Sequence, residues 1–146
     1  MSSASRTTRR TPALSKLSDE ALLDLPLKSL RVSIEGGWLE ESLGDLNAEL
    51  AARGLLVQAH GWISDEWFSP QDTPGIAFPF YLAHPRLMRL ERKMMLEVEG
   101  GTRRDCMRIL RHEAGHVVQY AYGLHRRKRW QALFGRASRP YPDHYR

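Results

Sequence analysis

The sequence lacks the features of disulfide-rich and membrane-spanning proteins. It has a single cysteine, Cys106, among 146 residues, which excludes an internal disulfide framework and a zinc site built from several cysteines. Its longest apolar run, residues 76–82, is interrupted by Pro79 and is far shorter than the roughly 20 residues that span a bilayer. We therefore expect a cytoplasmic protein with no membrane contact.

The chain has only a small excess of basic charge. It contains 22 Lys and Arg against 17 Asp and Glu, a formal net charge of +5. That excess permits an acidic partner without requiring one. A content of 27% charged and 42% hydrophobic residues is ordinary for a globular protein. The length fits one domain, which we expect over residues 15–146, after a tail of residues 1–14.

Both ends of the chain are basic. Residues 1–14 are rich in Ser, Thr and Arg and contain no acidic residue, which predicts a disordered tail or, as an alternative, a transit peptide. From His125 onward the only acidic residue is Asp143, and four aromatic residues lie among the basic ones: Trp130, Phe134, Tyr141 and Tyr145. Such a mixture can bind single-stranded nucleic acid, although it is more often a solvated face.

Local patterns in the N-terminal half predict two helices and one short strand. A serine followed by two acidic residues marks a helix start within residues 17–30, which Pro26 interrupts. Apolar residues spaced three or four apart predict an amphipathic helix over residues 38–53. Residues 55–59 have the pattern of a strand, whereas residues 61–75 are rich in aromatic and turn-forming residues and predict a loop.

The C-terminal half predicts a strand and two helices. Residues 76–82 have the pattern of a strand, which Pro79 would confine to a sheet edge. Pro85 opens a helix. Six apolar residues of that segment are expected in the core: Leu87, Met88, Leu90, Met94, Met95 and Val98. Thr102 is a predicted cap for a long helix over residues 103–123. The expected fold class is α+β, helix-rich, with a small sheet packed on this last helix.

Residues 112–116 of the long helix read HEAGH, an H-E-x-x-H pattern. Residues four apart on a helix lie on one face, with about 5–6 Å between their Cβ atoms. Two imidazoles placed in this way can bind one zinc ion, each at roughly 2.0–2.1 Å. Glu113 lies about 100° around the helix from His112, where a carboxylate can take a proton from water at the metal. We therefore predict that His112 and His116 bind Zn²⁺ and that Glu113 is the general base.

The histidine pair lies at the margin of a wide apolar face of the predicted helix. That face is formed by residues between about 60° and 240° from His112: Cys106, Met107, Ile109, Leu110, Ala114, Val117, Val118 and Ala121. A metal-binding helix at the floor of a cleft needs this arrangement. The alternative is that the two histidines and Glu113 are hydrogen-bonded residues at the core margin, with no metal.

The motif is similar to that of a known family. Residues 110–119 (LRHEAGHVVQ) resemble the active-site helix of the zincin metallopeptidases. More narrowly, the chain resembles bacterial proteins described as zinc-binding metallopeptidases, over about residues 35–146. Besides the HEAGH helix, the matching segments are residues 75–87 (GIAFPFYLAHPRL) and 139–146 (RPYPDHYR).

This resemblance implies a fold, an activity and a set of site residues. The fold would be zincin-like, and the reaction would be hydrolysis of a peptide or protein substrate. His112 and His116 would be zinc ligands, and Glu113 would be the general base. Residues 76–82 would form the edge strand that pairs with extended substrate.

The third zinc ligand is not identified. The metzincin pattern would require Gly at position 119 and His at 122, but the chain has Gln119 and Tyr122. The resemblance implies a glutamate on a later helix, beyond Arg146, so we expect a C-terminally truncated chain with weak or absent activity on its own. Seven other residues are candidates for the third ligand: His60, Asp65, Glu66, His84, His125, Asp143 and His144.

Two functional hypotheses follow from these patterns. The first is a zinc-dependent metallopeptidase. The alternative is a non-catalytic basic module that binds nucleic acid or an acidic protein, and it ranks second because it leaves the H-E-x-x-H pattern unexplained. The oligomeric state is open, and a second chain could complete the metal site.

Overall fold

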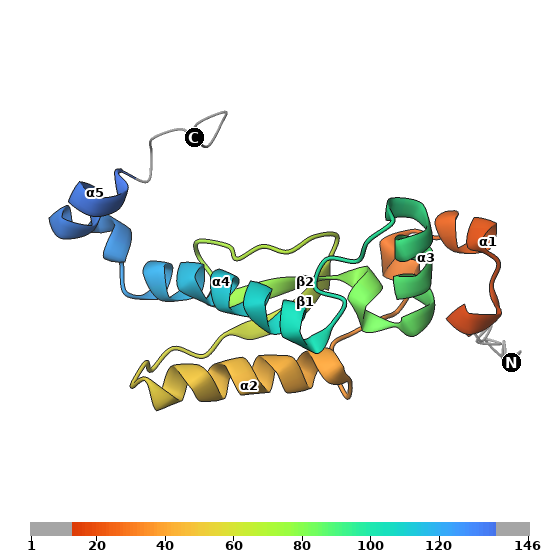
Figure 1. Cartoon of the computed structure of the whole chain (residues 1–146), viewed down its shortest axis with the longest axis horizontal. Coiled ribbons are helices and arrows are strands. Elements are labelled where there is room, and N and C mark those ends of the chain that lie inside the picture. Colours follow the sequence, from red (N-terminus) through yellow and green to blue (C-terminus); the bar gives the residue numbers. More distant parts are fainter. Residues whose placement is uncertain (1–12, 137–146) are drawn as a thin grey trace, which may run out of the picture.

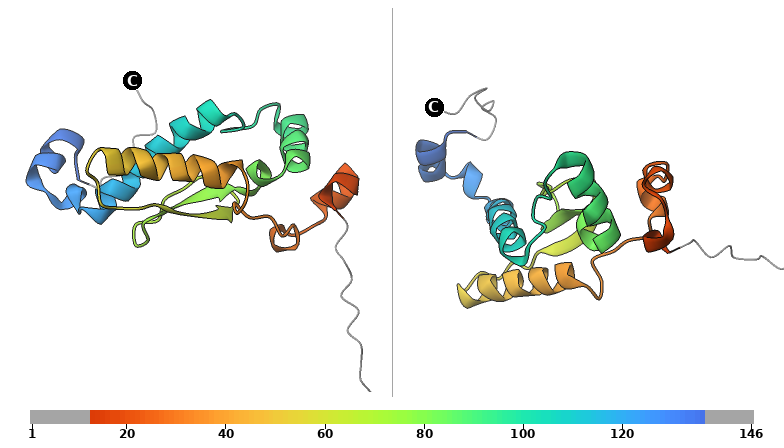
Figure 2. Two further views of the ribbon diagram at one scale, coloured as in Figure 1. Left: turned by 90° about the horizontal axis from the view of Figure 1, so that it is seen from below. Right: turned by 45° about the vertical axis from the view of Figure 1, so that its right-hand side comes forward.

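The computed structural model describes residues 13–136 and has an α+β fold in which helices predominate (Figure 1). In chain order its elements are η1 (Leu14–Lys16), α1 (Asp19–Leu23), η2 (Leu27–Ser29), α2 (Trp38–Ala52), β1 (His60–Ser64), β2 (Gly75–Pro79), η3 (Phe80–Ala83), α3 (Pro85–Met95), α4 (Arg103–Ala121), η4 (Leu124–Arg126) and α5 (Lys128–Phe134). The N-terminal segment and α5 lie at opposite ends of the long axis (Figures 1 and 2).

The main core lies between α2, α4 and the sheet. Helix α2 contacts α4 and β1, and α4 contacts β2. Both helices bury the apolar stripe that their spacing predicts, together with alternate residues of β2. The buried residues of this core are Leu39, Leu43, Leu46, Leu50, Ala59, Ile76, Phe78, Leu82, Cys106, Met107, Leu110, Ala114 and Val117. The predicted small sheet packed on the H-E-x-x-H helix is therefore present.

The first strand lies later in the chain than its prediction. Strand β1 pairs parallel to β2, with His60 opposite Gly75, so the prediction of a strand at residues 55–59 and a loop from residue 61 was wrong. The backbone of Ala59 is paired elsewhere: its N–H donates to Asn47 Oδ1 at 2.9 Å, and its carbonyl accepts from Asn47 Nδ2 at 3.0 Å. Gly61 lets β1 approach α2, since a Cβ there would lie 2.7 Å from Leu43 Cδ2.

The connection between the strands is short for a parallel pair. Residues 65–74, here called the return segment, must run back along the sheet, and such crossovers usually take a dozen or more residues and a helix. This one contains no helix. It passes along the outer edge of β2, where Phe68 forms an isolated antiparallel bridge with Ala77. The amide of Ala77 donates to the carbonyl of Phe68 at 2.8 Å.

A second core joins the N-terminal segment to α3. Its buried residues are Leu14, Leu22, Leu30, Leu87 and Leu90. Residues 1–12 of the predicted tail lie outside the described residues, but Leu14 belongs to the folded part. Helix α3 ends when Leu96 adopts φ 66°. The predicted burial of two methionines beside that end was wrong, because Met94 and Met95 are 56% and 64% exposed.

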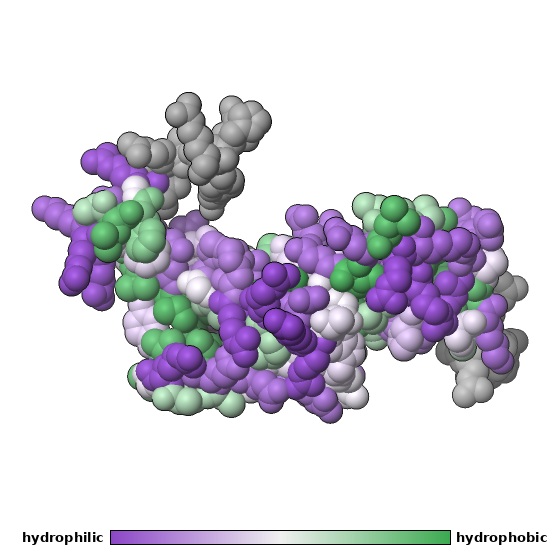
Figure 3. All heavy atoms as spheres, in the orientation of Figure 1, coloured by the Kyte–Doolittle hydropathy of each residue, from purple (hydrophilic) through white to green (hydrophobic). Residues whose placement is uncertain are grey.

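The surface is mainly polar over α2 and α4, whereas exposed apolar side chains gather at the two ends of the molecule, over α3 and α5 (Figure 3). At the α5 end, Leu133 and Phe134 are each 70% exposed. Across residues 13–136, no helix combines the length and the apolar character needed to cross a membrane.

Candidate metal centre

Helix α4 carries all three residues of the predicted site. It begins where the Thr102 hydroxyl accepts the Asp105 amide at 3.2 Å, which satisfies one of the unpaired N–H groups of a helix N-terminus. Its outer face is tied to α2 by Arg111, which donates to both carboxylate oxygens of Glu49 at 2.9 and 2.7 Å. Its inner face packs in the main core. The helix is thus held on both sides, and the orientation of its remaining face is set.

The structure brings His112 and His116 together on that face. Their ring centroids are 5.1 Å apart, with the planes at 80°. His112 is exposed, and His116 is half-buried against Tyr120, whose ring stacks on it with centroids 6.2 Å apart. This separation follows from the four-residue spacing. It leaves two imidazoles accessible to one ion.

Glu113 is oriented by a residue that the motif does not contain. Its side chain is buried, with 9% of the residue exposed. The Ser69 hydroxyl donates to Glu113 Oε2 at 2.9 Å and also lies 3.3 Å from the Glu113 carbonyl oxygen. Sequence reasoning missed Ser69, because it lies in a predicted loop 44 residues away and no local pattern signals the contact.

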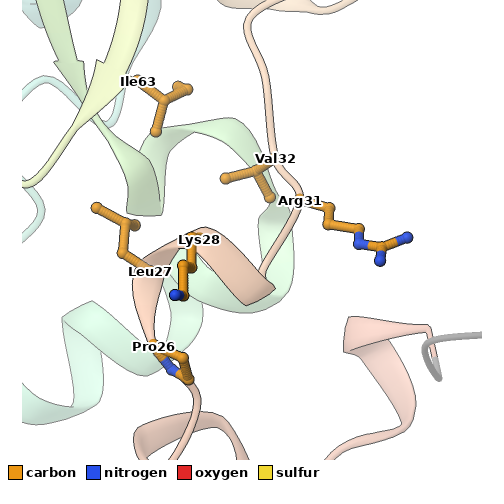
Figure 4. Close-up of a pocket in the computed structure, with 6 residues that line it drawn as sticks. All are labelled: Pro26, Leu27, Lys28, Arg31, Val32 and Ile63. Carbon is orange, nitrogen blue, oxygen red and sulfur yellow. The ribbon is translucent and has the colours of Figure 1, made fainter.

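A cavity of about 420 Å³ adjoins the motif. Its lining residues come from the return segment, the end of the α3–α4 connection and α4: Glu66, Trp67, Glu99, Arg108, Ile109, His112 and Glu113. A larger cavity of about 560 Å³ lies elsewhere, between the N-terminal segment and Ile63 (Figure 4). None of its lining residues belongs to the H-E-x-x-H motif, whereas the smaller cavity is lined by His112 and Glu113.

The substitutes for a third ligand are scattered. Within residues 13–136, no three His, Cys, Asp or Glu side chains form a group that could hold a metal ion. Of the predicted substitutes, Glu66 lines the cavity next to His112, whereas the His84 imidazole accepts the Arg86 amide as a helix cap at 3.1 Å. Asp143 and His144 lie outside the described residues.

His125 differs from the solvated histidine that its basic surroundings suggested. Gly123 adopts φ 60° and ends the path of α4, and the chain then turns His125 inward, where it is buried. The Tyr120 ring contacts the imidazoles of both His116 and His125, with centroids 6.2 and 5.9 Å away respectively. Among the described residues, no hydrogen-bond partner meets His125 Nδ1. The structure does not bring this histidine to the His112–His116 pair.

The only cysteine is not part of the site. Cys106 lies on the inner face of α4 and has no exposed surface. Burial raises the pKa of its thiol to about 11, because the charged thiolate is poorly solvated in an apolar environment. Of the cysteine and histidine side chains on this helix, the two histidines are therefore the ones with exposed surface.

Comparison with known proteins identifies no relative. No family model, curated protein or solved structure matches the chain. The interpretation of the site therefore depends on the residues of α4 and on their neighbours. The similarity to zincins remains a prediction from the motif.

Proposed function

We propose that this protein is a zinc-dependent metallopeptidase of the zincin type, acting on a peptide or protein substrate. The observation that carries the proposal is the geometry of one helical turn. Two imidazoles one helical turn apart have centroids 5.1 Å apart and planes at 80°, and the buried carboxylate of Glu113 lies on the same turn, at the wall of a cavity. A structural pair of surface histidines would not require a carboxylate held at this position by Ser69.

His112 and His116 would supply two of the protein ligands that a zinc ion needs. Bound zinc would supply a Lewis acid for amide hydrolysis. Glu113 would take a proton from the attacking water and pass it to the leaving amine. The hydrogen bond from Ser69 occupies Oε2, which leaves Oε1 free for this transfer.

Catalytic zinc sites normally have three protein ligands, so the proposal requires one more. Glu66 is one source, because it lines the same cavity as His112. Its side chain would have to move to join the histidine pair, since no three described His, Cys, Asp or Glu residues are placed to hold a metal ion. The other sources are residues outside 13–136 and a second chain. A Glu66→Gln variant separates the first source from the other two, because its zinc content falls only if Glu66 is the ligand.

The proposal is tested by zinc content and hydrolysis together. Protein purified without a metal-affinity tag should contain about one zinc per chain by elemental analysis, and His116→Ala should contain little. Glu113→Gln should keep its zinc and hydrolyse a quenched casein substrate about 10²–10⁴-fold more slowly than the parent. Equal zinc in the parent and His116→Ala, or full activity in Glu113→Gln, would refute the proposal.

A second candidate function, a basic binding module, rests on the α5 end of the molecule. Arg127, Lys128 and Arg129 are exposed there, next to the exposed Leu133 and Phe134. Binding to nucleic acid through this surface would weaken steeply with salt. It would be unaffected by chelators and by Glu113→Gln, which separates it from the metallopeptidase.

A further inference from the structure

The return segment occupies the outer edge of β2. One side of this strand pairs with β1. On the other side, the Ala77 amide donates to the Phe68 carbonyl at 2.8 Å, and the two residues form an antiparallel bridge. Extended peptides bind proteins by adding to an exposed sheet edge through such backbone hydrogen bonds. At Ala77 that position is already taken by the chain itself.

The same segment also contacts the candidate general base. One residue after Phe68, the Ser69 hydroxyl donates to Glu113 Oε2 at 2.9 Å. Trp67, one residue before it, lines the cavity beside His112 and Glu113. Three consecutive residues therefore cover the strand edge, the carboxylate and the cavity wall. A peptide that approached along β2 would meet all three.

A limited set of contacts holds the return segment. Its backbone accepts hydrogen bonds from the Ala77 amide at Phe68 and from the His60 amide at Pro74. The Ser69 hydroxyl meets the side chain and the carbonyl of Glu113, and Trp67 packs against the main core. Trp67 packs on Phe78, with centroids 5.1 Å apart, and Phe68 meets Trp62 at 6.2 Å. Phe68 is 38% exposed, and residues 71–74 are also exposed. Separating Phe68 from Ala77 breaks one backbone hydrogen bond and the Phe68–Trp62 contact, and such a local opening costs less free energy than unfolding of the core.

We propose that the return segment is autoinhibitory: it occupies the outer edge of β2 at Ala77 and one oxygen of the Glu113 carboxylate, and an extended peptide must displace it to bind. This inference rests on the proposed function for the role of Glu113. The occlusion of the strand edge can be tested without zinc or turnover.

The experiment measures the binding of a synthetic peptide that has the sequence of the return segment. A fluorescently labelled synthetic peptide of residues 65–74 (DEWFSPQDTP) is titrated into the full-length parent, into Phe68→Ala/Ser69→Ala, and into the control Gln71→Ala/Thr73→Ala. The control changes two exposed residues of the same segment. The tethered segment competes at an effective concentration that reaches millimolar for short flexible linkers. We therefore expect the peptide to bind the first variant at least about tenfold more tightly than the parent or the control.

A second measurement, hydrogen exchange of the Ala77 amide, reports directly on the outer edge of β2. Hydrogen exchange of the Ala77 amide should be about tenfold faster in Phe68→Ala/Ser69→Ala than in the parent, because its acceptor is released more often. Ser69→Ala alone keeps both aromatic contacts and should give a smaller change in the same direction. Thermal unfolding of each variant shows whether it remains folded.

Two results would overturn the inference. One is equal peptide binding by the parent and by Phe68→Ala/Ser69→Ala, and the other is an unchanged exchange rate of the Ala77 amide in that variant. Absence of zinc from the parent would instead refute the proposed function. The peptide-binding and exchange results would still test whether the return segment occludes the edge of β2.

Discussion

Glu113 is placed where a carboxylate is costly. It is buried, and Ser69 is the hydrogen-bond donor that its side chain meets among the described residues. Burying a charged group with so few partners lowers stability. Stability alone therefore does not explain a carboxylate at this position, and under the proposed function it is the general base.

Gly115, in the same motif, is not required by packing within the described residues. It is exposed, and a Cβ at this position would meet no atom within 4 Å. Glycine inside a helix costs roughly 0.5–1 kcal/mol relative to alanine. Gly115→Ala should therefore raise the free energy of unfolding by about 0.5–1 kcal/mol, measured by urea denaturation.

Gly61→Ala is the matched control for this measurement. Its added Cβ would lie 2.7 Å from Leu43 Cδ2 and 2.8 Å from Ile34 Cδ1, so it should lower the free energy of unfolding. A loss of stability in Gly115→Ala would contradict the prediction. It would indicate that an element outside residues 13–136 packs on this side of α4.

Cys106 should be unreactive in the folded protein. It has no exposed surface, and burial raises its pKa to about 11, while the thiolate is the nucleophilic form. At pH 8, modification by a thiol reagent should therefore require unfolding. The test compares the rate of the native protein with that of the protein in urea, and a fast native reaction would show that α4 separates from α2.

At the scale of elements, Asp19 attaches the N-terminal segment to α3. Its carboxylate accepts from Lys93 Nζ and from Arg86 Nη2, each at 2.5 Å. These hydrogen bonds, that from Lys93 first, lower the pKa of Asp19 below its ordinary value. A lowered pKa in the folded state stabilises the protein above the ordinary aspartate pKa of about 3.9, and this contribution is lost as the pH falls through the folded-state value.

Asp19→Asn should thus lower the melting temperature at pH 7. The difference from the parent should shrink as the pH falls below about 3.9, where the parent carboxylate also becomes protonated. The control is Asp24→Asn, which lies at the other end of α1 and makes no ion pair with any described residue. Thermal unfolding at both pH values measures the effect, and a difference that persists unchanged at low pH would contradict the role of the charge.

Local patterns predicted the helices better than the strands. Helix α2 lies at the predicted residues, and α4 begins at its predicted Thr102 cap, because helix hydrogen bonds and caps join residues close in sequence. Strand β1 was misplaced, since its register depends on pairing with β2 and its approach to α2 on Gly61. The exposed Met94 has the spacing of a core residue, but no element of the described chain covers it.

At the scale of the molecule, two cores share one bridging residue. The main core lies around α2, α4 and the sheet, and the second lies between α3 and the N-terminal segment. Tyr81 packs against both. Burial, followed by the nearby charges of Glu91 and Glu99, raises its pKa to about 12, so it stays neutral at physiological pH. The candidate metal centre belongs to the main core alone.

This division predicts separate opening of the second core. Leu22→Ala should remove about 2–5 kcal/mol of packing there. Hydrogen exchange should accelerate in α1 and α3 while the amides of α4 keep the rates of the parent. Equal acceleration in α4 would show that the two cores unfold as one unit.

The sequence by itself determined the helices and the histidine pair on α4, because these depend on residues within one or two helical turns of each other. It also indicated the α+β class through its spacing patterns. Only the tertiary structure decided that Ser69 meets Glu113, that Phe68 pairs with Ala77, and that His125 is buried against Tyr120. The first two contacts exist because a short connection between parallel strands has to return beside β2, and no local pattern specifies the edge along which it returns.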